Sequence, residues 1–393
     1  MINIKEFYLL VVLILLILSC NLEVIPDQIG GNASKFNTSI GGNGNDFPSD
    51  VLAMTDGNFI VAGVTQSFTA DMNNDAYLAK VDKDGVIVWE KNYGTATDDN
   101  AHSVTTASDG GFVLAGRTTD PINLNYNIFL VKVNSAGGEV WRKTYGASDS
   151  TEVVFGIIPT GASDFLVGYT SSALVFSTPQ IRFMRINANG SKVSDKLGGT
   201  RLVGLNRMIK AADNSIVVTG YSSDGGTSAY VAKFMEAGSM IWDKVFPETG
   251  QNYSPSFGLI EMADRSLFIA GSDLGSNDHD FMLVSYSEIG MKIDDTIWGG
   301  ANADELLAVT KSADDEVVVM GYSGSFSVSH EIYLSKRRKI DGSEIWAKHF
   351  GQTWVQGGDV ELCPDGGFVL ITGQNQANAD IIVVKTDANG NYE

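Results

Sequence analysis

One glycine, placed at the end of an apolar run, recurs along the chain and constrains its fold more than any other feature. It stands at Gly63, Gly116, Gly168, Gly220, Gly271, Gly321 and Gly373, so successive copies lie 53, 52, 52, 51, 50 and 52 residues apart. Self-similarity at a fixed period of this length is typical of repeat architectures. Seven such units account for nearly all of the chain after its first residues and leave no room for a second domain.

Each unit contains four short apolar segments separated by turns. In residues 98–146 the segments are "HSVTTA", "FVLAGRT", "IFLVKV" and "EVWRKTYG", and the connections are "SDGG", a longer polar loop and "NSAGG". Asp-Gly and Gly-Gly pairs supply the positive φ that hairpins need, and no segment sustains the helical period of 3.6. A β-helix, the alternative all-β fold, would show shorter rungs without paired tight turns. We therefore expect an all-β, seven-bladed β-propeller of four-stranded blades.

The fourth segment of the seventh unit is missing, because the chain stops at "TDANGNYE". A matching fragment, "KFNTSIGG", occurs at residues 35–42, and it places Phe36 where other units carry Trp89, Trp141, Trp242 or Trp346. An open ring would expose two unpaired strand edges. We expect residues 35–41 to supply the last strand and close the ring, and the tryptophans to pack between blades.

The repeat motif is specific enough to resemble a known family. The motif runs "DGGFVLAG" (109–116), "YLAKVDKDG" (77–85) and "WEKNYG" (89–94) in its best copies. It resembles the SBBP-type β-propeller repeat lipoproteins of bacteria, which are grouped with quinoprotein-dehydrogenase-like propellers, over residues 36–393. The resemblance implies the architecture but little about activity, because such propellers serve as enzymes, scaffolds and binding modules alike.

The N-terminal segment has the features of a bacterial lipoprotein signal. Residues 7–18 form an apolar run of twelve, too short for a comfortable membrane span, and "ILSC" ends in Cys20. We expect a signal peptide at 1–19, a lipidated Cys20 with a tether at 20–34, and the propeller at 35–393. Acyl chains on Cys20 would anchor the protein in the cell envelope, at the outer membrane or cell surface rather than the inner membrane. An ordinary signal peptide, or a signal anchor with an incidental cysteine, remains the alternative.

The net charge disfavours one class of partner, and the cysteine content excludes a disulfide framework. The net charge of −20 disfavours nucleic acid, and two cysteines, Cys20 and Cys363, give no disulfide framework. The Asp-x-Asp/Asn-Gly spacing at 82–85 and 387–390 is known from calcium loops, but the same position in other units lacks the carboxylates. We interpret these segments as turns and expect no cofactor or metal.

A binding site is expected where the loops vary. The first and third turns of each unit are tight and monotonous, and they share one face, which we call the tight-turn face. The second loops and the connections between blades share the opposite face and differ from unit to unit; we call it the variable-loop face. Variable loops on a rigid scaffold are where binding is built. The candidate ligand contacts are Trp354, Asp50, Asp359, His102, His279, His330 and Tyr126.

Three of these residues are candidates for specific reasons that the repeat pattern provides. Trp354 has no counterpart in the other units, so repeat packing does not explain it. Asp50 and Asp359 lie about thirteen residues before the recurring glycine, where the innermost strands should approach the axis. The other positions of that set are Ser103, Phe155, Arg207, Gly258 and Ala308, which form no uniform ring. This favours an irregular axial pocket, or none, over a symmetric metal site.

The leading hypothesis is a lipid-anchored, extracytoplasmic propeller that binds or scaffolds a protein, peptide or glycan through its variable-loop face. The alternative is a propeller enzyme, either a quinoprotein-like dehydrogenase or a glycoside hydrolase. No calcium, quinone-cofactor and catalytic Asp constellation can be assembled from the motifs, and no catalytic residue is assigned.

Overall fold

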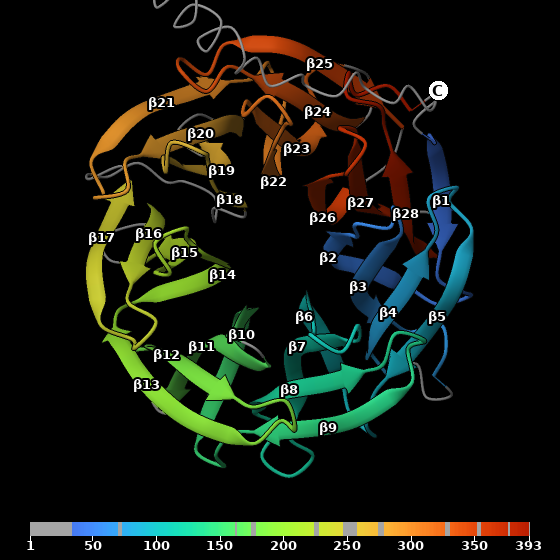
Figure 1. Ribbon diagram of the computed structural model, residues 1–393, viewed down its shortest axis with the longest axis vertical. Helices are drawn as coiled ribbons and strands as arrows, with labels where there is room; N and C mark the ends of the chain where they lie inside the picture. The colour runs from blue at the N-terminus through green and yellow to red at the C-terminus, as the bar shows by residue number, and fades with distance from the viewer. Residues whose placement is uncertain are drawn as a thin grey trace, which may run out of the picture. The chain divides into compact units, whose positions relative to one another are not determined.

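The computed structural model confirms the seven-bladed propeller. It describes residues 34–69, 73–161, 163–173, 178–223, 228–246, 258–273, 279–326, 331–351, 355–375 and 378–392. Within these ranges twenty-eight strands form seven four-stranded sheets. Every recorded pairing is antiparallel, and the sheets stand as blades around a central axis (Figure 1). No helix in the described ranges is long and apolar enough to cross a membrane.

The strands occupy the same four ranks in each blade, from the axis outward. The innermost strands are β2 (Asp46–Ala53), β6 (Asp99–Thr106), β10 (Ser150–Thr160), β14 (Val203–Lys210), β18 (Gly258–Glu261), β22 (Asp304–Lys311) and β26 (Val355–Leu362). The second strands are β3 (Phe59–Thr65), β7 (Phe112–Thr119), β11 (Asp164–Ala173), β15 (Ile216–Ser222), β19 (Leu267–Asp273), β23 (Val317–Ser323) and β27 (Phe368–Asn375). The third strands are β4 (Asp75–Val81), β8 (Tyr126–Val133), β12 (Gln180–Ile186), β16 (Ser228–Phe234), β20 (Asp280–Tyr286), β24 (Glu331–Arg337) and β28 (Ala379–Lys385). The outermost strands are β5 (Ile87–Tyr93), β9 (Glu139–Tyr145), β13 (Lys192–Thr200), β17 (Met240–Phe246), β21 (Lys292–Trp298), β25 (Glu344–Phe350) and, in the seventh blade, β1 (Phe36–Ile40).

The ring is closed by the N-terminal strand, as the repeat frame predicts. β1 pairs with β28 in an antiparallel register that sets Phe36 opposite Lys385 and Ile40 opposite Ile381. Figure 1 shows this blue strand completing the red blade. The pairing satisfies the edge of β28, whose backbone groups would otherwise be unpaired.

The tryptophans pack between blades at the third turn of the following blade. A Cβ on Gly137 would lie 3.0 Å from the Trp89 ring, and one on Gly290 would lie 2.7 Å from the Trp242 ring. The Trp242 Nε1 also donates a hydrogen bond of 3.1 Å to the Glu288 carbonyl. Phe36 takes the same place against Gly85, where a Cβ would lie 2.6 Å from its ring. Phe36, which aligns with the tryptophans in the sequence, therefore packs between blades as they do.

The hydrophobic core lies between neighbouring blades rather than in one centre. Successive residues of β3 serve different neighbours: Ile60 packs toward the second blade, and Val61 packs toward the seventh. Both side chains are fully buried. The second and third strands are covered on both faces, so they read as continuous apolar runs. Each such side chain contributes roughly 1.5–3 kcal/mol by its burial.

The calcium-like segments form side-chain-capped turns. The Asp82 Oδ1 atom accepts 2.9 Å hydrogen bonds from the backbone N–H groups of Asp84 and Val86. Asp387 does the same for Asn389 and Asn391, also at 2.9 Å. A short polar side chain that caps its own turn explains the recurring Asp or Asn before the glycine.

Candidate functional site

The innermost strands share a β-bulge that shapes the wall of the axial channel. Pairing with the second strand skips one residue in all six blades whose inner strand the structure describes across this position. The skipped residues are Ser49, His102, Phe155, Asn206, Leu307 and Gly357. A bulge re-aims side chains and bends its strand. Five of these six residues line one cavity at the channel mouth.

The bulge accounts for the recurring glycine. Gly116 lies opposite the bulge of its blade, and a Cβ there would stand 1.7 Å from the backbone oxygen of Asn100. The corresponding distance is 1.9 Å at Gly220 and 2.0 Å at Gly321. No side chain fits at such distances. The bulge therefore explains the glycine in these three blades, and at Gly168 the ring of the skipped residue Phe155 occupies the place of a Cβ, 2.2 Å from it.

Arg207 reaches across the channel from the fourth blade. Its Nη2 atom lies 2.5 Å from the Asp359 Oδ1 atom of the seventh blade, and its Nη1 atom lies 3.4 Å from the Asp50 Oδ1 atom of the first. Figure 1 shows β14 on the opposite side of the axis from β2 and β26. One guanidinium thus joins three blades that are distant in the sequence.

The carboxylates around Arg207 also link neighbouring blades through the backbone. The Asp50 Oδ2 atom accepts hydrogen bonds from the Val104 N–H at 2.8 Å and the Ser103 hydroxyl at 3.0 Å. The Asp359 Oδ2 atom accepts the Val51 N–H at 3.3 Å. The Glu361 Oε2 atom accepts the Ala53 N–H at 2.7 Å. These bonds hold the inner strands of the seventh, first and second blades in fixed positions.

Burial shifts the protonation of this cluster. Burial raises the pKa of Asp50 to about 7, although the Arg207 charge acts against the rise and the Asp359 charge adds to it. Burial likewise raises the pKa of Glu361 to about 8. For Arg207, burial favours the neutral form, but the charges of Asp359 and Asp50 outweigh it and hold its pKa above the ordinary value. The channel therefore contains carboxyl groups that exchange protons near neutral pH.

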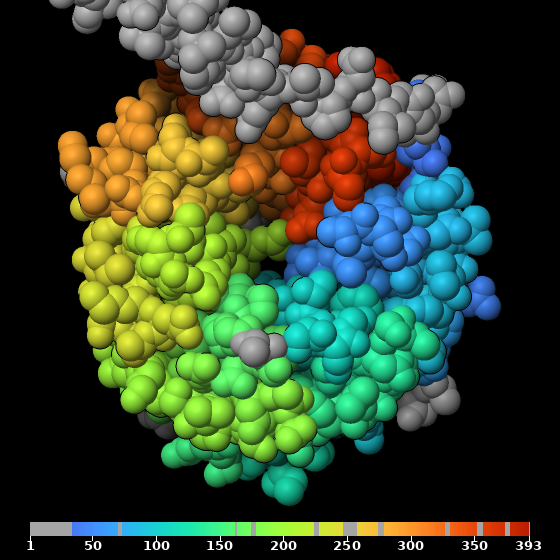
Figure 2. Space-filling view, viewed as in Figure 1, coloured from blue at the N-terminus to red at the C-terminus, as the bar shows by residue number. Residues whose placement is uncertain are grey.

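Two axial cavities meet at Arg207. The cavity on the variable-loop side has a volume of about 370 Å³ and is lined by Ser49, His102, Asn206, Arg207, Glu305 and Tyr322, among others. The cavity on the tight-turn side has a volume of about 270 Å³ and is lined by Asp50, Ser103, Phe155, Arg207, Lys210 and Glu361, among others. The Tyr322 hydroxyl donates a hydrogen bond to the Glu305 carboxylate in the first cavity. Figure 2 shows the hollow at the hub where the blades converge.

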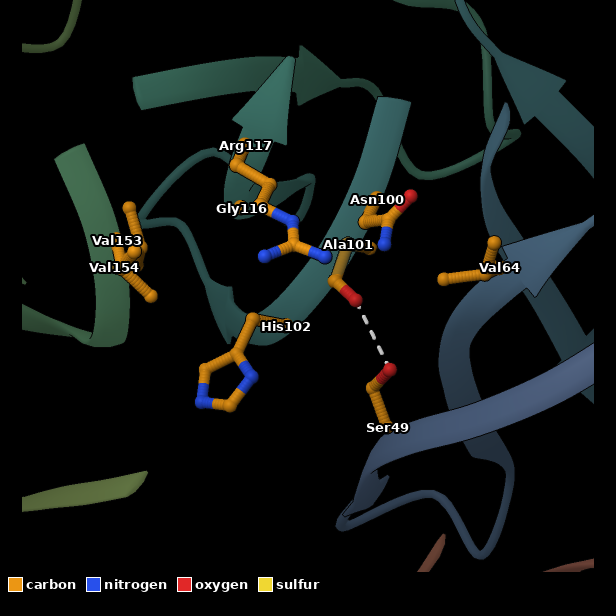
Figure 3. Close-up of a pocket in the computed structure, with 9 residues that line it drawn as sticks. All are labelled: Ser49, Val64, Asn100, Ala101, His102, Gly116, Arg117, Val153 and Val154. Carbon is orange, nitrogen blue, oxygen red and sulfur yellow. Dashed lines mark hydrogen bonds between the residues drawn. The ribbon is translucent and has the colours of Figure 1, made fainter. Parts of the chain in front are cut away.

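A third cavity, of about 260 Å³, opens between the first three blades and shares Ser49 and His102 with the cavity at the mouth. Figure 3 shows the Arg117 guanidinium in it, between Asn100 and the backbone around Val153. Arg117 also lies over the Tyr126 ring, 4.1 Å from the ring centroid. His102 extends toward the fourth blade, where its Nε2 atom lies 3.0 Å from the Asn206 carbonyl oxygen.

The structure brings some of the sequence-predicted site residues together and separates others. Asp50, Asp359 and His102 meet around Arg207 at the channel, and Tyr126 joins them through Arg117. His279 does not line any of these three cavities; it precedes β20, and its carbonyl oxygen accepts the Asp304 N–H at 2.6 Å. Trp354, His330 and Cys20 lie outside the described residues.

Sequence reasoning missed Arg117, Asn206 and Glu361. A signal for Arg117 exists in the repeat frame, because the residue after the recurring glycine is Val, Tyr or Ser in five other blades, Gln in the seventh, and Arg only here. Asn206 and Glu361 carry no such signal, since the bulge that positions them is visible only in the pairing. Among the described residues, no group of three or more His, Cys, Asp or Glu side chains is arranged to hold a metal ion.

Comparisons with known proteins identify the fold alone. No family model matches the chain, and no curated protein matches it. Among solved structures, Sqt1 from Chaetomium thermophilum matches at 11% identity and a TM-score of 0.50, covering 90% of this chain and 100% of that one. A protein of unknown function from Dyadobacter fermentans DSM 18053 matches at 9% identity and a TM-score of 0.53, covering 89% and 97%. BBS1N, solved in complex with ARL6DN, matches at 13% identity and a TM-score of 0.51, covering 92% and 99%. At such low identity these likenesses establish a β-propeller and nothing finer.

Proposed function

We propose that the protein is a lipid-anchored, extracytoplasmic binding or scaffold module that takes a protein, peptide or glycan ligand at its variable-loop face. The observation that carries the proposal is the cavity of about 370 Å³ at the channel mouth. It lies within the range of ligand sites, which extends from about 300 to 1,000 Å³. Its wall combines apolar surface with a few convergent polar side chains, which is the composition expected of a binding site.

The direction of β1 supports the choice of face. Ser34, just before β1, donates a hydrogen bond of 2.9 Å to the Asp84 side chain in a third turn of the first blade. The chain thus enters the propeller on the tight-turn face. A tether running from a lipidated Cys20 would reach the propeller there, so the variable-loop face would point away from the membrane.

Site-specific photo-cross-linking in native membranes tests the face. A benzophenone amino acid replaces Ile122, which is 85% exposed in the loop after β7, or Val86, which is 60% exposed in a third turn. We expect a ligand to be captured from position 122 and not from position 86. Capture from position 86 alone, or equally from both positions, would contradict the proposed face.

The anchor has its own test. Cys20→Ser removes the thiol that acylation requires, so the variant should leave the detergent phase for the aqueous phase in a phase-partition assay. Wild-type protein that already partitions into the aqueous phase would show that the chain is not lipidated.

One observation favours the enzyme alternative. The pKa of Asp50 is raised to about 7, and that of Glu361 to about 8, in a channel cavity. Carboxyls titrating near neutral pH can act as acid and base in glycoside hydrolysis. However, both oxygens of Asp50 are engaged by Arg207, Val104 and Ser103. Release of reducing ends from oligosaccharides by the wild type, and not by Glu361→Gln, would support this alternative over a binding module.

A further inference from the structure

Arg117 is a guanidinium without an ionic partner in a strongly acidic protein. The chain carries a net charge of −20, and other arginines of the described residues, among them Arg142, Arg182 and Arg185, pair with carboxylates. Within the described ranges Arg117 makes no hydrogen bond or ion pair, and its guanidinium carbon lies over the Tyr126 ring, 4.1 Å from the ring centroid. The ring fixes the plane of the guanidinium, so its N–H edge is presented to the cavity with little rotamer freedom left to lose.

The other polar groups of this cavity suit hydroxyl groups. The Asn100 amide, which makes no hydrogen bond within the described residues, supplies both a donor and an acceptor. The Ser49 hydroxyl donates to the Ala101 carbonyl at 2.9 Å, which leaves its oxygen lone pairs available (Figure 3). Arg117 is the one Lys or Arg side chain among the described residues that line this cavity, and Arg207, which lines the two adjacent cavities, is paired with Asp50 and Asp359.

His102 contributes an acceptor. Its Nε2 atom faces the Asn206 carbonyl, which can only accept, so Nε2 carries the proton. Burial lowers the pKa of His102, so the ring is neutral and Nδ1 keeps a lone pair. The cavity thus combines one cation with neutral acceptors and donors.

We propose that this cavity binds the carboxylate of an acidic sugar, with Arg117 on the carboxylate and Asn100, Ser49 and His102 on ring hydroxyls. The inference rests on the proposed function, because it names the ligand of the same face. One guanidinium matches one carboxylate in geometry and charge, whereas a phosphate dianion would face a single cation in a molecule of net charge −20. Ser49 and His102 also line the cavity at the mouth, so a second sugar ring has about 370 Å³ beside the first.

The test compares matched sugars. Full-length protein in detergent is titrated calorimetrically with three pairs of disaccharides, of the gluco, galacto and manno series. The members of each pair differ only in whether the terminal sugar is a uronic acid or its parent hexose. A charge-assisted hydrogen bond discriminates by roughly 10- to 100-fold, so at least one acid should bind tighter than its parent by that factor. Arg117→Gln should reduce its affinity to that of the neutral parent.

Three further variants keep the test decisive. Arg185→Gln is the matched control, because Arg185 pairs with Asp164 at 2.9 Å and lines none of these cavities; it should bind as the wild type does. Arg117→Lys keeps the charge but loses the fork, so its preference for the acid should be intermediate. Asn100→Ala should weaken the acid and its parent alike, and it serves if Arg117→Gln does not fold.

Failure of this inference can be told from failure of the proposed function. If no acid binds tighter than its parent, or if Arg117→Gln keeps the preference, the carboxylate site is wrong. If the benzophenone at position 122 still captures a ligand in that case, the variable-loop face survives as a binding face. If it captures nothing either, both the inference and the proposed function fall.

Discussion

Arg207 controls the charge balance of the axial channel. Its two ion pairs span the ring, and Asp359 is only 1% exposed, so an uncompensated carboxylate there would have little water to solvate it. Removing one partner of a buried pair usually costs more than the pair itself contributes, because a buried charge is left alone.

Arg207→Met should therefore lower the free energy of unfolding by about 3 kcal/mol at pH 8. The loss should be smaller at pH 5, where Asp50, with its pKa of about 7, is protonated and needs no counter-charge. Urea unfolding at both pH values measures the effect. Arg185→Met is the control: it removes a surface pair with Asp164 and should cost at most about 1 kcal/mol. Equal losses for the two variants would contradict the role assigned to Arg207.

Glu361 should make stability fall with rising pH. Its pKa rises from 4.5 to about 8 on folding, so between these values the native state holds a proton that the unfolded chain has released. The contribution of Glu361 to stability is then fully present below about pH 4.5 and is lost as the pH rises to about 8. Glu361→Gln, whose amide oxygen can still accept the Ala53 N–H, should remove part of this decline. At pH 9 the variant should be more stable than the wild type by on the order of 1 kcal/mol.

The control for this variant is Glu261→Gln, because Glu261 also accepts a backbone N–H, that of Ala212, but through an exposed hydrogen bond. Chemical denaturation from pH 4.5 to 9 gives both profiles. A Glu361→Gln profile parallel to that of the wild type would show that this carboxyl does not titrate as described.

At the residue scale, the sequence places several channel residues but not their contacts. Counting about thirteen residues back from the recurring glycine brings Asp50, Arg207 and Asp359 toward the axis, where they are found. That Arg207 pairs with both acids depends on closing the ring, since 157 and 152 residues separate it from them. The Arg117–Tyr126 contact is equally hidden, because both residues lie in variable positions of the repeat.

At the scale of the strand, the bulge on the inner strand and the glycine on the second strand depend on each other. The glycine period is plain in the sequence, but its cause is the unpaired residue on the neighbouring strand. Periodicity alone predicts that side chains alternate regularly along the inner strand. It therefore assigns every residue after the bulge to the wrong face of the sheet. This is why the ranks and turns could be predicted from the sequence while the residues facing the channel could be placed only approximately.

Gly116→Ala tests this coupling. Its Cβ would meet the Asn100 backbone oxygen at 1.7 Å, so the two strands must separate, at a cost of about 2–3 kcal/mol. Gly199→Ala is the control, because the nearest atom to its Cβ is the Met240 methyl at 3.5 Å. That variant should change stability by less than about 0.5 kcal/mol. Thermal unfolding compares the two, and a Gly116→Ala variant as stable as Gly199→Ala would refute the coupling.

At the scale of the whole molecule, closure of the ring by β1 fixes which blades are neighbours and on which face the chain enters the propeller. The fold, its seven blades and the strand that closes them could be predicted from repeat spacing, because each blade carries the same turns and the missing strand is found at the other terminus. The chain enters on the tight-turn face because an outermost strand begins there, as the Ser34–Asp84 hydrogen bond shows. Two of the three cavities take part of their wall from the seventh blade, through Gly357 and Gly358 at the channel mouth and Glu361 on the tight-turn side.

Removal of residues 35–41 tests the closed ring most directly. The truncated chain loses the five-residue strand β1 and exposes the edge of β28 along its pairing from Ile381 to Lys385. An exposed edge pairs with other chains. We therefore expect a lower melting temperature and concentration-dependent oligomers in analytical ultracentrifugation, both reversed when a peptide of the β1 sequence is added. A truncated protein that stays monomeric and melts at the wild-type temperature would contradict the closed ring.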